Sequence, residues 1–449
     1  MSEEGGSAEG SGSSCGEEEE DESEECPVTS AWIAEVIASH KGHQQVEVVD
    51  MCIRPGCDAA DAVLSDIVAV RATYRHQADP ADRSAALIVK LLPREPFSRY
   101  FVTEAQFDLR EIKFYTQVVP ELEAFARRQA GSGADAVRLP IPECYHARYV
   151  PPEAETEPGP DGESVLVLED LRARGFGGAD FSRGLSLRQA HAALAAVARL
   201  HALSLALKVK GDGEGSGPVS LPQRYPFLFQ TARATDSYQQ LVERGLPQLA
   251  SFLERRPGLE PVLAALLALR PRTKDIIASL LAPQEPLALI THTDFWCNNL
   301  LFRGGNDEGE RGGVVGGEPE EEAGGSGGAC ECAVLDWQMV TYSRPTNDVA
   351  LLLVSSVGTA LRRERTAELL DGYWSALTAA ARSLRLDVQR ELAYDRQRLQ
   401  ADYRRSQLLA LLLCIGSVDV ALGDPLTEQR LIDVLHDLHA DGVLDAEDL

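Results

Sequence analysis

The sequence lacks the features of secreted, membrane-anchored and zinc-binding proteins. Its N-terminus, MSEEGGSAEG, has neither the basic nor the apolar segment of a signal peptide, and no apolar run reaches the length that spans a bilayer. The nine cysteines are scattered without the paired spacing of zinc sites. We therefore expect a cytoplasmic protein with reduced thiols and no membrane association.

Basic residues are also scarce, since the formal net charge is −27. Residues 1–26 contain eleven acids and no Lys or Arg, and residues 304–330 contain seven acids and one Arg. These two segments carry −17 of the charge, which leaves only −10 for the rest of the chain. The sequence therefore offers no broad basic surface for nucleic acid, and a nucleotide site would need locally placed cations.

The 449 residues are enough for two lobes. Residues 1–26 predict a disordered acidic tail because they contain too few apolar groups to form a core. Residues 303–330 have the same character and predict a disordered Gly/Glu-rich insert. We expect an N-terminal nucleotide-binding lobe over residues 27–170 and a helical C-terminal lobe over residues 171–449.

The N-terminal lobe shows alternating patterns typical of strands. VLSDIVAVRATYR (63–75) and AALIVKLL (85–92) predict a hairpin, and Lys90 would lie on a central strand. Further strands are expected at 143–150 and 164–168. Between them, residues 101–119 predict one helix whose apolar face comprises Phe107, Glu111, Phe114 and Val118.

The remainder predicts mostly helices. A long Ala- and Leu-rich helix should run from Ser186 to about Leu207, and short apolar strands are expected at 287–290, 300–302 and 333–335. The further helices expected are 234–255, 259–282, 346–360, 363–384, 387–415 and 426–439. The fold class is therefore α+β, with an antiparallel sheet and one key helix in the first lobe.

The segment ITHTDFWCNNLLF (290–302) carries the strongest chemical signal. It places Asp294 and Asn299 five residues apart on a loop between two short strands. Phosphoryl transfer needs a carboxylate that takes a proton from the acceptor hydroxyl and an amide oxygen that binds a magnesium ion. The pattern indicates a kinase, although an Asx-rich turn with capping side chains would look similar.

Three further residues complete this pattern. Asp336 ends the strand AVLD and is suited to bind the magnesium ion between the β- and γ-phosphates. Lys90 closes an apolar run, where it needs a partner, and Glu111 on the following helix is the natural one. An exposed edge-strand lysine is the alternative for Lys90, and Glu104 is the alternative acid one turn earlier on the same face.

These residues give the chain a resemblance to the ecdysteroid kinase-like (CHK kinase-like) family. That family lies within the aminoglycoside phosphotransferase and choline kinase-like branch of the protein kinase fold. The matching stretches extend over roughly residues 56–420 and are IVKLLP (88–93), FDLREIKFYTQVVPEL (107–122), VLVLEDLRARGF (165–176), VARLHALS (197–204), THTDFWCNNLLF (291–302) and VLDWQMVTYSRPTNDVALLL (334–353).

The resemblance implies a two-lobed protein kinase-like fold with ATP and Mg²⁺ as cofactors. Lys90 would hold the α- and β-phosphates and Glu111 would orient it, Asp294 would be the base, and Asn299 and Asp336 would bind magnesium. The backbone of Leu168, Glu169, Asp170 and Leu171 would meet adenine. His292 and Asp348 would brace the catalytic loop, and His201 would pack beneath it.

The chain also departs from this family. In the expected nucleotide loop, GCDAADAVLS (56–65), Ala60 stands where a glycine is expected, although Ser65 can still donate a hydroxyl to phosphate. Thr293 occupies a position where the family more often has glycine. The insert between Asn299 and Asp336 is long, but loop closure entropy grows slowly with length, so the flanking strands can still pair.

The sequence favours a small-molecule acceptor. Protein kinases place a lysine two residues after the base, whereas this chain has Trp296 there. Phe295 and Trp296 suggest apolar walls that suit a steroid, ecdysteroid-like alcohol, unless both rings are core. Tyr373, Trp374 and Tyr403 are further candidates for the acceptor pocket. Choline, ethanolamine or a xenobiotic alcohol, and a catalytically inactive pseudokinase, remain alternatives. No nucleic-acid, membrane or obligate protein partner is expected.

Overall fold

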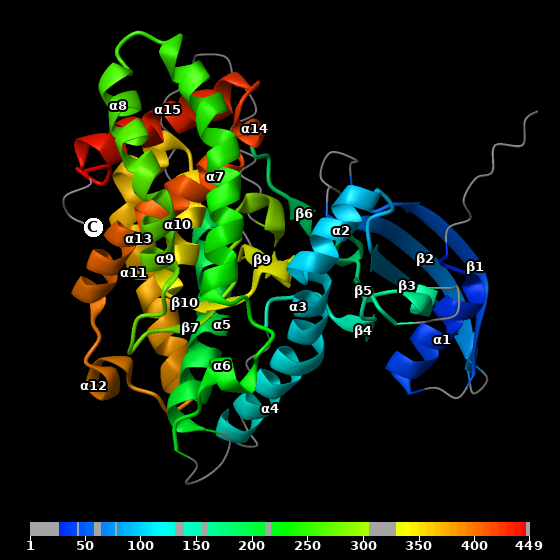
Figure 1. The fold of residues 1–449 in the computed structure, drawn as a ribbon. Helices are drawn as coiled ribbons and strands as arrows, with labels where there is room; N and C mark the ends of the chain where they lie inside the picture. Colours follow the sequence, from blue (N-terminus) through cyan, green and yellow to red (C-terminus); the bar gives the residue numbers. More distant parts are fainter. Residues whose placement is uncertain are drawn as a thin grey trace, which may run out of the picture.

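The computed structural model describes residues 27–42, 45–57, 64–76, 79–130, 139–154, 160–211, 217–304 and 329–445. A β-sheet with a few helices lies beside a larger helical part (Figure 1). The α+β class expected from the sequence is thereby confirmed. The expectations for residues 1–26, for most of the 303–330 insert and for Ala60 lie outside the described residues. The division at residue 170 stays a prediction.

A five-stranded antiparallel sheet forms the first part, in the order β1-β2-β3-β5-β4. Its strands are β1 (Val46–Pro55), β2 (Asp66–His76), β3 (Asp79–Leu91), β4 (Cys144–Arg148) and β5 (Val165–Glu169). The predicted hairpin is confirmed as β2 and β3, and β1 adds a strand that the sequence analysis missed. Because β3 is the middle strand, Lys90 lies between Ile67 of β2 and Leu166 of β5.

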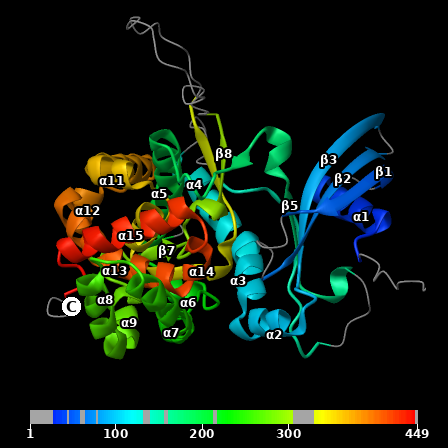
Figure 2. The ribbon, with the colours of Figure 1, turned by 90° about the horizontal axis from the view of Figure 1, so that it is seen from above.

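One face of this sheet is covered by α1 (Ser30–Lys41), which the sequence analysis also missed (Figure 2). Ile33 and Ile37 of α1 are fully buried against Val70, Ala72 and other sheet residues in a core of their own. Alternation along β2 sends these apolar side chains to that face, as the pattern predicts. The opposite face is left for the helix that carries Glu111.

The single helix predicted over residues 101–119 is wrong in its continuity. The chain forms α2 (Pro96–Ala105), α3 (Phe107–Lys113), a π-helical turn (Phe114–Val118) and α4 (Val119–Ala130). Gln106 has φ 58° and ends α2 before α3 begins, because a left-handed residue interrupts the helical hydrogen bonds. The predicted apolar face nevertheless holds, since Phe107, Glu111, Phe114 and Val118 are all buried.

The second part is mostly helical, as predicted. Its helices are α5 (Leu187–Lys210), α6 (Leu221–Arg224), α7 (Thr231–Glu254), α8 (Glu260–Leu269), α9 (Thr273–Leu281), α10 (Pro345–Ser355), α11 (Thr359–Ser383), α12 (Val388–Leu392), α13 (Arg396–Gly416), α14 (Val418–Ala421) and α15 (Pro425–Ala440). Two predicted helices are each divided in the structure. The helix predicted over 259–282 is interrupted by a 3₁₀ turn that contains Pro271, and the one predicted over 387–415 is interrupted near Ala393, which has φ 49°.

Short strands lie beneath the helices. β7 (Leu289–Thr291) pairs with β10 (Thr341–Ser343), and β8 (Leu300–Arg303) pairs with β9 (Glu331–Val334) and β6 (Gly177–Gly178). The predicted pairing of the strands on either side of the insert is confirmed. These two small sheets hold the segments that contain Asp294 and Asp336 at fixed positions.

Helix α5 is the central helix of this part. Ser186 caps its N-terminus in a capping box with Gln189. In length and composition it could span a membrane, contrary to the expectation from sequence, and 72% of its apolar window is buried inside the protein. Burial by the surrounding helices, chiefly α11, accounts for its apolar character.

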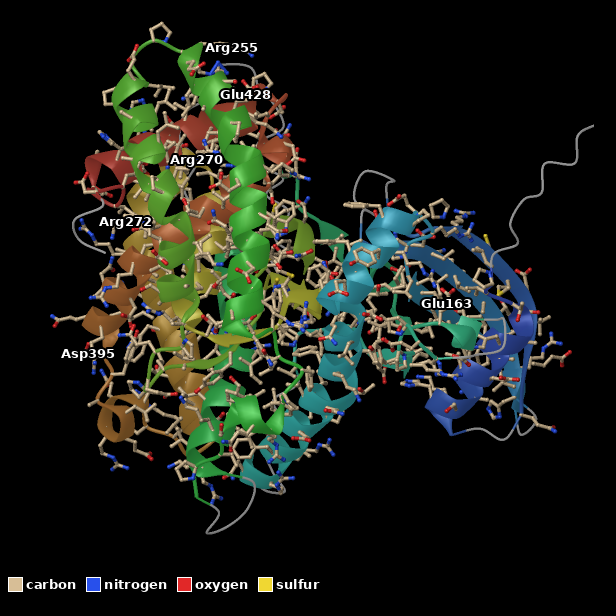
Figure 3. All side chains as sticks on the ribbon, viewed as in Figure 1. Glu163, Arg255, Arg270, Arg272, Asp395 and Glu428 are labelled. Atoms are coloured by element: carbon tan, nitrogen blue, oxygen red, sulfur yellow. The ribbon has the colours of Figure 1, made fainter. Side chains whose placement is uncertain are left out.

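Two glycines allow α7 and α13 to cross closely. A Cβ added at Gly245 of α7 would lie 1.8 Å from the carbonyl oxygen of Ile415, and one added at Gly416 would lie 3.0 Å from Cβ of Leu241. Beyond this crossing, Arg256, just after α7, forms an ion pair with Glu428 of α15 at 2.5 Å. Glu428 is labelled in Figure 3. The crossing therefore fixes how α7 approaches the C-terminal helices.

The crossing generates a stability prediction. We expect Gly245→Ala to lower the free energy of unfolding by about 1–3 kcal/mol, because the new methyl group forces α7 and α13 apart. Urea unfolding measures this change. Gly217→Ala is the matched control, since no atom lies within 4 Å of its added Cβ. Equal stability of the two variants would contradict the close crossing.

Candidate functional site

Lys90 binds two carboxylates from distant parts of the chain. Its Nζ lies 2.6 Å from Oε2 of Glu111 on α3 and 3.0 Å from Oδ1 of Asp336. The Lys90 side chain is only 13% exposed, so the alternative of an exposed edge-strand lysine is wrong. The sheet, α3 and the segment after β9 therefore meet at one ammonium group.

Glu111 is held on both sides. Its Oε2 accepts from Lys90, and its Oε1 accepts from the backbone N–H of Trp337 at 3.3 Å. Glu104, the alternative acid, is exposed on α2 because the break at Gln106 separates the two helices. Glu111 is therefore the acid that reaches the site.

The charged groups in this cluster shift one another's pKa values. Burial alone would lower the pKa of Lys90, but the Asp336 and Glu111 carboxylates raise it above its usual value. Burial raises the pKa of Glu111, an effect that Lys90 opposes and Asp336 reinforces. Lys90 therefore stays charged and is the counter-ion of both acids.

The loop between β7 and β8 presents Asp294 and Asn299 together. The Asn299 amide nitrogen donates to Oδ2 of Asp294 at 2.8 Å and to its backbone oxygen at 2.9 Å. Burial raises the pKa of Asp294; the Asp336 carboxylate adds to this shift, and the hydrogen bond from Asn299 opposes it. Asn299 thereby fixes the orientation of the Asp294 carboxylate.

His292 is locked within this loop. Its Nδ1 accepts from the backbone N–H of Asp294 at 3.2 Å, so its Nε2 carries the hydrogen and donates to the Leu335 carbonyl oxygen at 2.7 Å. This ring links the loop to the residue directly before Asp336. His292 therefore sets the spacing between Asp294 and Asp336 without facing an open site.

Asp348 of α10 anchors the loop from below. Its two carboxylate oxygens accept from the backbone N–H groups of His292 and Thr293, each at 2.7 Å. His201 of α5 lies 3.1 Å from the same carboxylate, and its other ring nitrogen lies 2.8 Å from the Tyr373 hydroxyl. Thr293 has φ 70°, which explains why glycine suits this position and shows that Asp348 holds a strained residue.

Asn299 and Asp336 have the chemistry of a magnesium site. With its amide nitrogen turned to Asp294, Asn299 offers its oxygen, and Asp336 has a second oxygen besides the one that binds Lys90. Such oxygen ligands suit Mg²⁺, which proteins hold with few side chains together with substrate phosphates. No group of three or more His, Cys, Asp or Glu that could hold a metal occurs within the described ranges.

The predicted nucleotide contacts lie on or next to the inner strands β2, β3 and β5 of the sheet. Ser65 lines a small recess together with Lys90 and Glu111, and its hydroxyl donates to the Leu64 carbonyl oxygen at 2.8 Å. Glu169 ends β5, and Asp170 and Leu171 begin the segment that leads to the helical part. Residues 58–63 of the expected nucleotide loop, including Ala60, lie outside the described residues.

Arg172 is a site residue that the sequence analysis missed. It forms a bidentate pair with Asp170, with nitrogen–oxygen distances of 2.8 and 3.1 Å, and donates to the Gly56 carbonyl oxygen at 2.9 Å. It therefore ties the segment between the two parts to the start of the nucleotide loop. The sequence offered only a weak signal, an Asp-x-Arg spacing.

A cavity of about 580 Å³ opens beside Asp294. Its walls are mainly apolar and come from α2, α3, α7, α10, α13, α14 and α15, with Phe97, Phe101 and Phe107 among the lining residues. Trp296 lines the cavity, whereas Phe295 is fully buried in the core, so the two predicted rings have different roles. Of the other candidates, Tyr373, Trp374 and Tyr403 do not line it.

Comparison with known proteins identifies the chain. A family model described as "Ecdysteroid kinase-like family" matches residues 59–312, more than half of the sequence. The chain belongs to the ecdysteroid kinase-like family. A second family model, described as "Uncharacterized oxidoreductase dhs-27", matches residues 322–429. No curated protein matches this member of the family.

Solved structures of low sequence identity resemble this family member. Plasmodium vivax ethanolamine kinase is 10% identical with a TM-score of 0.39, covering 86% of this chain and 83% of that chain. Choline kinase from Cryptosporidium parvum Iowa II is 9% identical with a TM-score of 0.43, and the match covers 88% of this chain and 91% of that chain. The GDP complex of wild-type aminoglycoside 2'-phosphotransferase-IIIa is 9% identical with a TM-score of 0.37, and the match covers 92% of this chain and 100% of that chain. Similarity at this level does not assign an activity.

Family membership and the observed geometry agree on the fold. A middle-strand lysine pairs with a helix glutamate, and a loop aspartate and asparagine precede a strand-end aspartate, as in protein kinases. The protein kinase-like fold expected from the resemblance is therefore confirmed.

The Asp348 anchor generates a second prediction. We expect Asp348→Asn to lower the free energy of unfolding by about 3 kcal/mol, because the new amide group faces a buried N–H donor and leaves it without an acceptor. The change is read from the urea midpoint. Asp371→Asn, which removes an exposed partner of Arg396, should cost less than about 1 kcal/mol. Equal losses in both variants would show that Asp348 is not an anchor.

Proposed function

We propose that this protein is an ATP-dependent kinase that transfers the γ-phosphate to a hydroxyl of a lipophilic small molecule. One observation carries the proposal: the Asp294 carboxylate lies both at the acceptor cavity and in the electrostatic environment of Asp336, which binds Lys90. An acceptor hydroxyl in the cavity and a phosphate chain at Lys90 would thus meet at one carboxylate.

Each residue of the cluster has a role in this reaction. Lys90, oriented by Glu111, binds the phosphate chain. Asp294 takes the proton of the acceptor hydroxyl as its oxygen attacks the γ-phosphorus, and the bond to the β,γ-bridging oxygen breaks so that ADP leaves. Burial raises the pKa of Asp294, which makes its carboxylate a better proton acceptor than an exposed one. A pseudokinase would not need all of these groups.

Asn299 and Asp336 would hold Mg²⁺ when ATP is bound. The ion neutralises charge that develops on the transferred phosphoryl group. With Mg²⁺ and ATP bound, Lys90 would be free to bind a phosphate oxygen in place of Asp336, and Asn299 would keep Asp294 in its present orientation. The backbone of Leu168 to Leu171 would meet adenine, with Arg172 fixing that segment against the nucleotide loop.

The cavity favours an apolar acceptor over choline or ethanolamine. Its volume of about 580 Å³ is that of a drug-sized ligand site. A cationic alcohol would need a cage of aromatic and acidic groups. Among the described residues that line the cavity, Asp294 is the single carboxylate, whereas Arg244 and Arg430 are both cationic. A steroid alcohol such as an ecdysteroid is therefore a better candidate than an amino alcohol.

Asp294 provides the test of catalysis. We expect Asp294→Asn to slow acceptor-dependent ADP release by about 10²- to 10⁴-fold, because the variant cannot accept the hydroxyl proton. Coupled ADP assays with Mg²⁺-ATP and a panel of alcohols measure the rate, and EDTA should abolish it. Asp275→Asn, an exposed acid on α9, is the control and should retain full activity. ATP binding without acceptor-dependent ADP release would favour the pseudokinase.

The acceptor is tested separately. Incubation with Mg²⁺-ATP and either an ecdysteroid or choline, followed by mass spectrometry, should yield a product heavier by one phosphoryl group only from the ecdysteroid, because choline finds no acidic cage. A second arm replaces Phe101, on the cavity wall, with Glu, which should reduce phosphorylation of the lipophilic substrate. Phosphorylation of choline at the higher rate would overturn the apolar acceptor while leaving the kinase assignment intact.

A further inference from the structure

Arg430 lies on the face of α15 that forms one wall of the acceptor cavity. Thr427, Arg430, Leu431 and Val434 all line the cavity, and their spacing of i, i+3, i+4 and i+7 places them on one side of a helix. Arg430 is only 6% exposed. A guanidinium group is therefore enclosed in a wall that is otherwise mainly apolar.

The contacts of this guanidinium leave its donors largely unused. Its central carbon lies 4.6 Å from the centre of the Phe181 ring, and Nη1 donates to the Ser182 carbonyl oxygen at a long 3.4 Å. Nη2 is buried without a hydrogen-bond partner. Within the described part of the chain Arg430 forms no ion pair, although an arginine can donate five hydrogen bonds.

The absence of a side chain at Gly184 leaves room for the Arg430 guanidinium group. Gly184 has φ 78°, and a Cβ there would lie 3.1 Å from Nη1 and 2.9 Å from the Ser356 carbonyl oxygen. Phe181 also packs edge-on against Trp296, at 5.6 Å between ring centres. Arg430 therefore lies on the Trp296 side of the cavity, separated from Asp294 by aromatic rings.

No carboxylate among the described residues forms an ion pair with Arg430. Burial lowers the pKa of Arg430, and Asp180 and Asp424 act on it only from beyond ion-pair distance. Arg244, also on the cavity lining, is exposed and has Asp419 at 3.9 Å as its ion-pair partner. A buried cation without a carboxylate partner is costly in a folded protein, and a ligand anion would offset that cost.

We propose that Arg430 binds an anionic oxygen group, a carboxylate or a sulfate, on the same molecule whose hydroxyl is presented to Asp294. The inference rests on the proposed function, since it assigns the second end of that acceptor. The acceptor is then an amphipathic alcohol: an apolar body fills the cavity, a hydroxyl lies at Asp294, and an anion lies at Arg430 beyond Phe181 and Trp296.

The experiment compares two probes that differ only in that group. Cholic acid and the alcohol made by reducing its carboxylate have the same ring hydroxyls. Calorimetric titration of the whole protein without ATP should give about tenfold tighter binding of the carboxylate, as expected for a charge-assisted hydrogen bond. Arg430→Gln should remove this preference, and Arg430→Lys should keep part of it because lysine retains the charge without the planar fork.

Arg365→Gln is the matched control, since Arg365 is exposed and pairs with Glu368 away from the cavity. It should leave the binding of both probes unchanged. Equal or tighter binding of the neutral probe to the unaltered protein overturns the inference, as does an equal loss for both probes in a folded Arg430→Gln variant. If that variant does not fold, the unaltered protein and Arg430→Lys still decide the outcome.

Binding and turnover separate the two proposals. Arg430-dependent binding of the carboxylate without phosphorylation would support the anion site and count against the kinase function. Phosphorylation of neutral alcohols, with no preference for the carboxylate, would support the kinase function and reject the anion site.

Discussion

The contact of Lys90 with Glu111 and Asp336 is the interaction on which the rest of the site depends. It joins the middle strand of the sheet, helix α3 and the segment after β9, which are separated by up to 246 residues in sequence. Each group is costly to bury alone, and together they compensate one another. Because Glu111 also accepts from Trp337, the cluster fixes the backbone around Asp336 as well as its side chain.

The catalytic loop is built on a different principle. Its order comes from backbone N–H groups bound to the Asp348 carboxylate and from the locked ring of His292, not from charge pairing. Thr293 keeps a left-handed backbone because two neighbouring N–H groups are held there. Asp294 and Asn299 are thus held in position by a rigid frame.

Much of this could be predicted from the sequence, for identifiable reasons. The alternation of apolar and polar residues predicted the β2–β3 hairpin, and the apolar face of the predicted helix placed Glu111 among buried residues. Both patterns show which face of an element is buried. The break at Gln106 was missed, since a left-handed glutamine has no sequence signal comparable with glycine. The brief patterns of α1 and β1 were also missed. The contact of Arg172 with Gly56 and that of Arg430 with Ser182 could not be found because the two residues of each contact lie 116 and 248 positions apart in sequence. The described cavity walls come from seven helices, and no local pattern predicts such convergence.

The joint at Gln106 has a consequence for how such enzymes diverge. Helix α2 contributes Phe97 and Phe101 to the cavity, and α3 contributes Glu111 to the ion cluster, while the left-handed Gln106 separates the two helices. Substitutions along α2 can therefore reshape the pocket while the register of α3 stays fixed. The joint allows substrate range to drift through evolution without disturbing the charges that perform the chemistry.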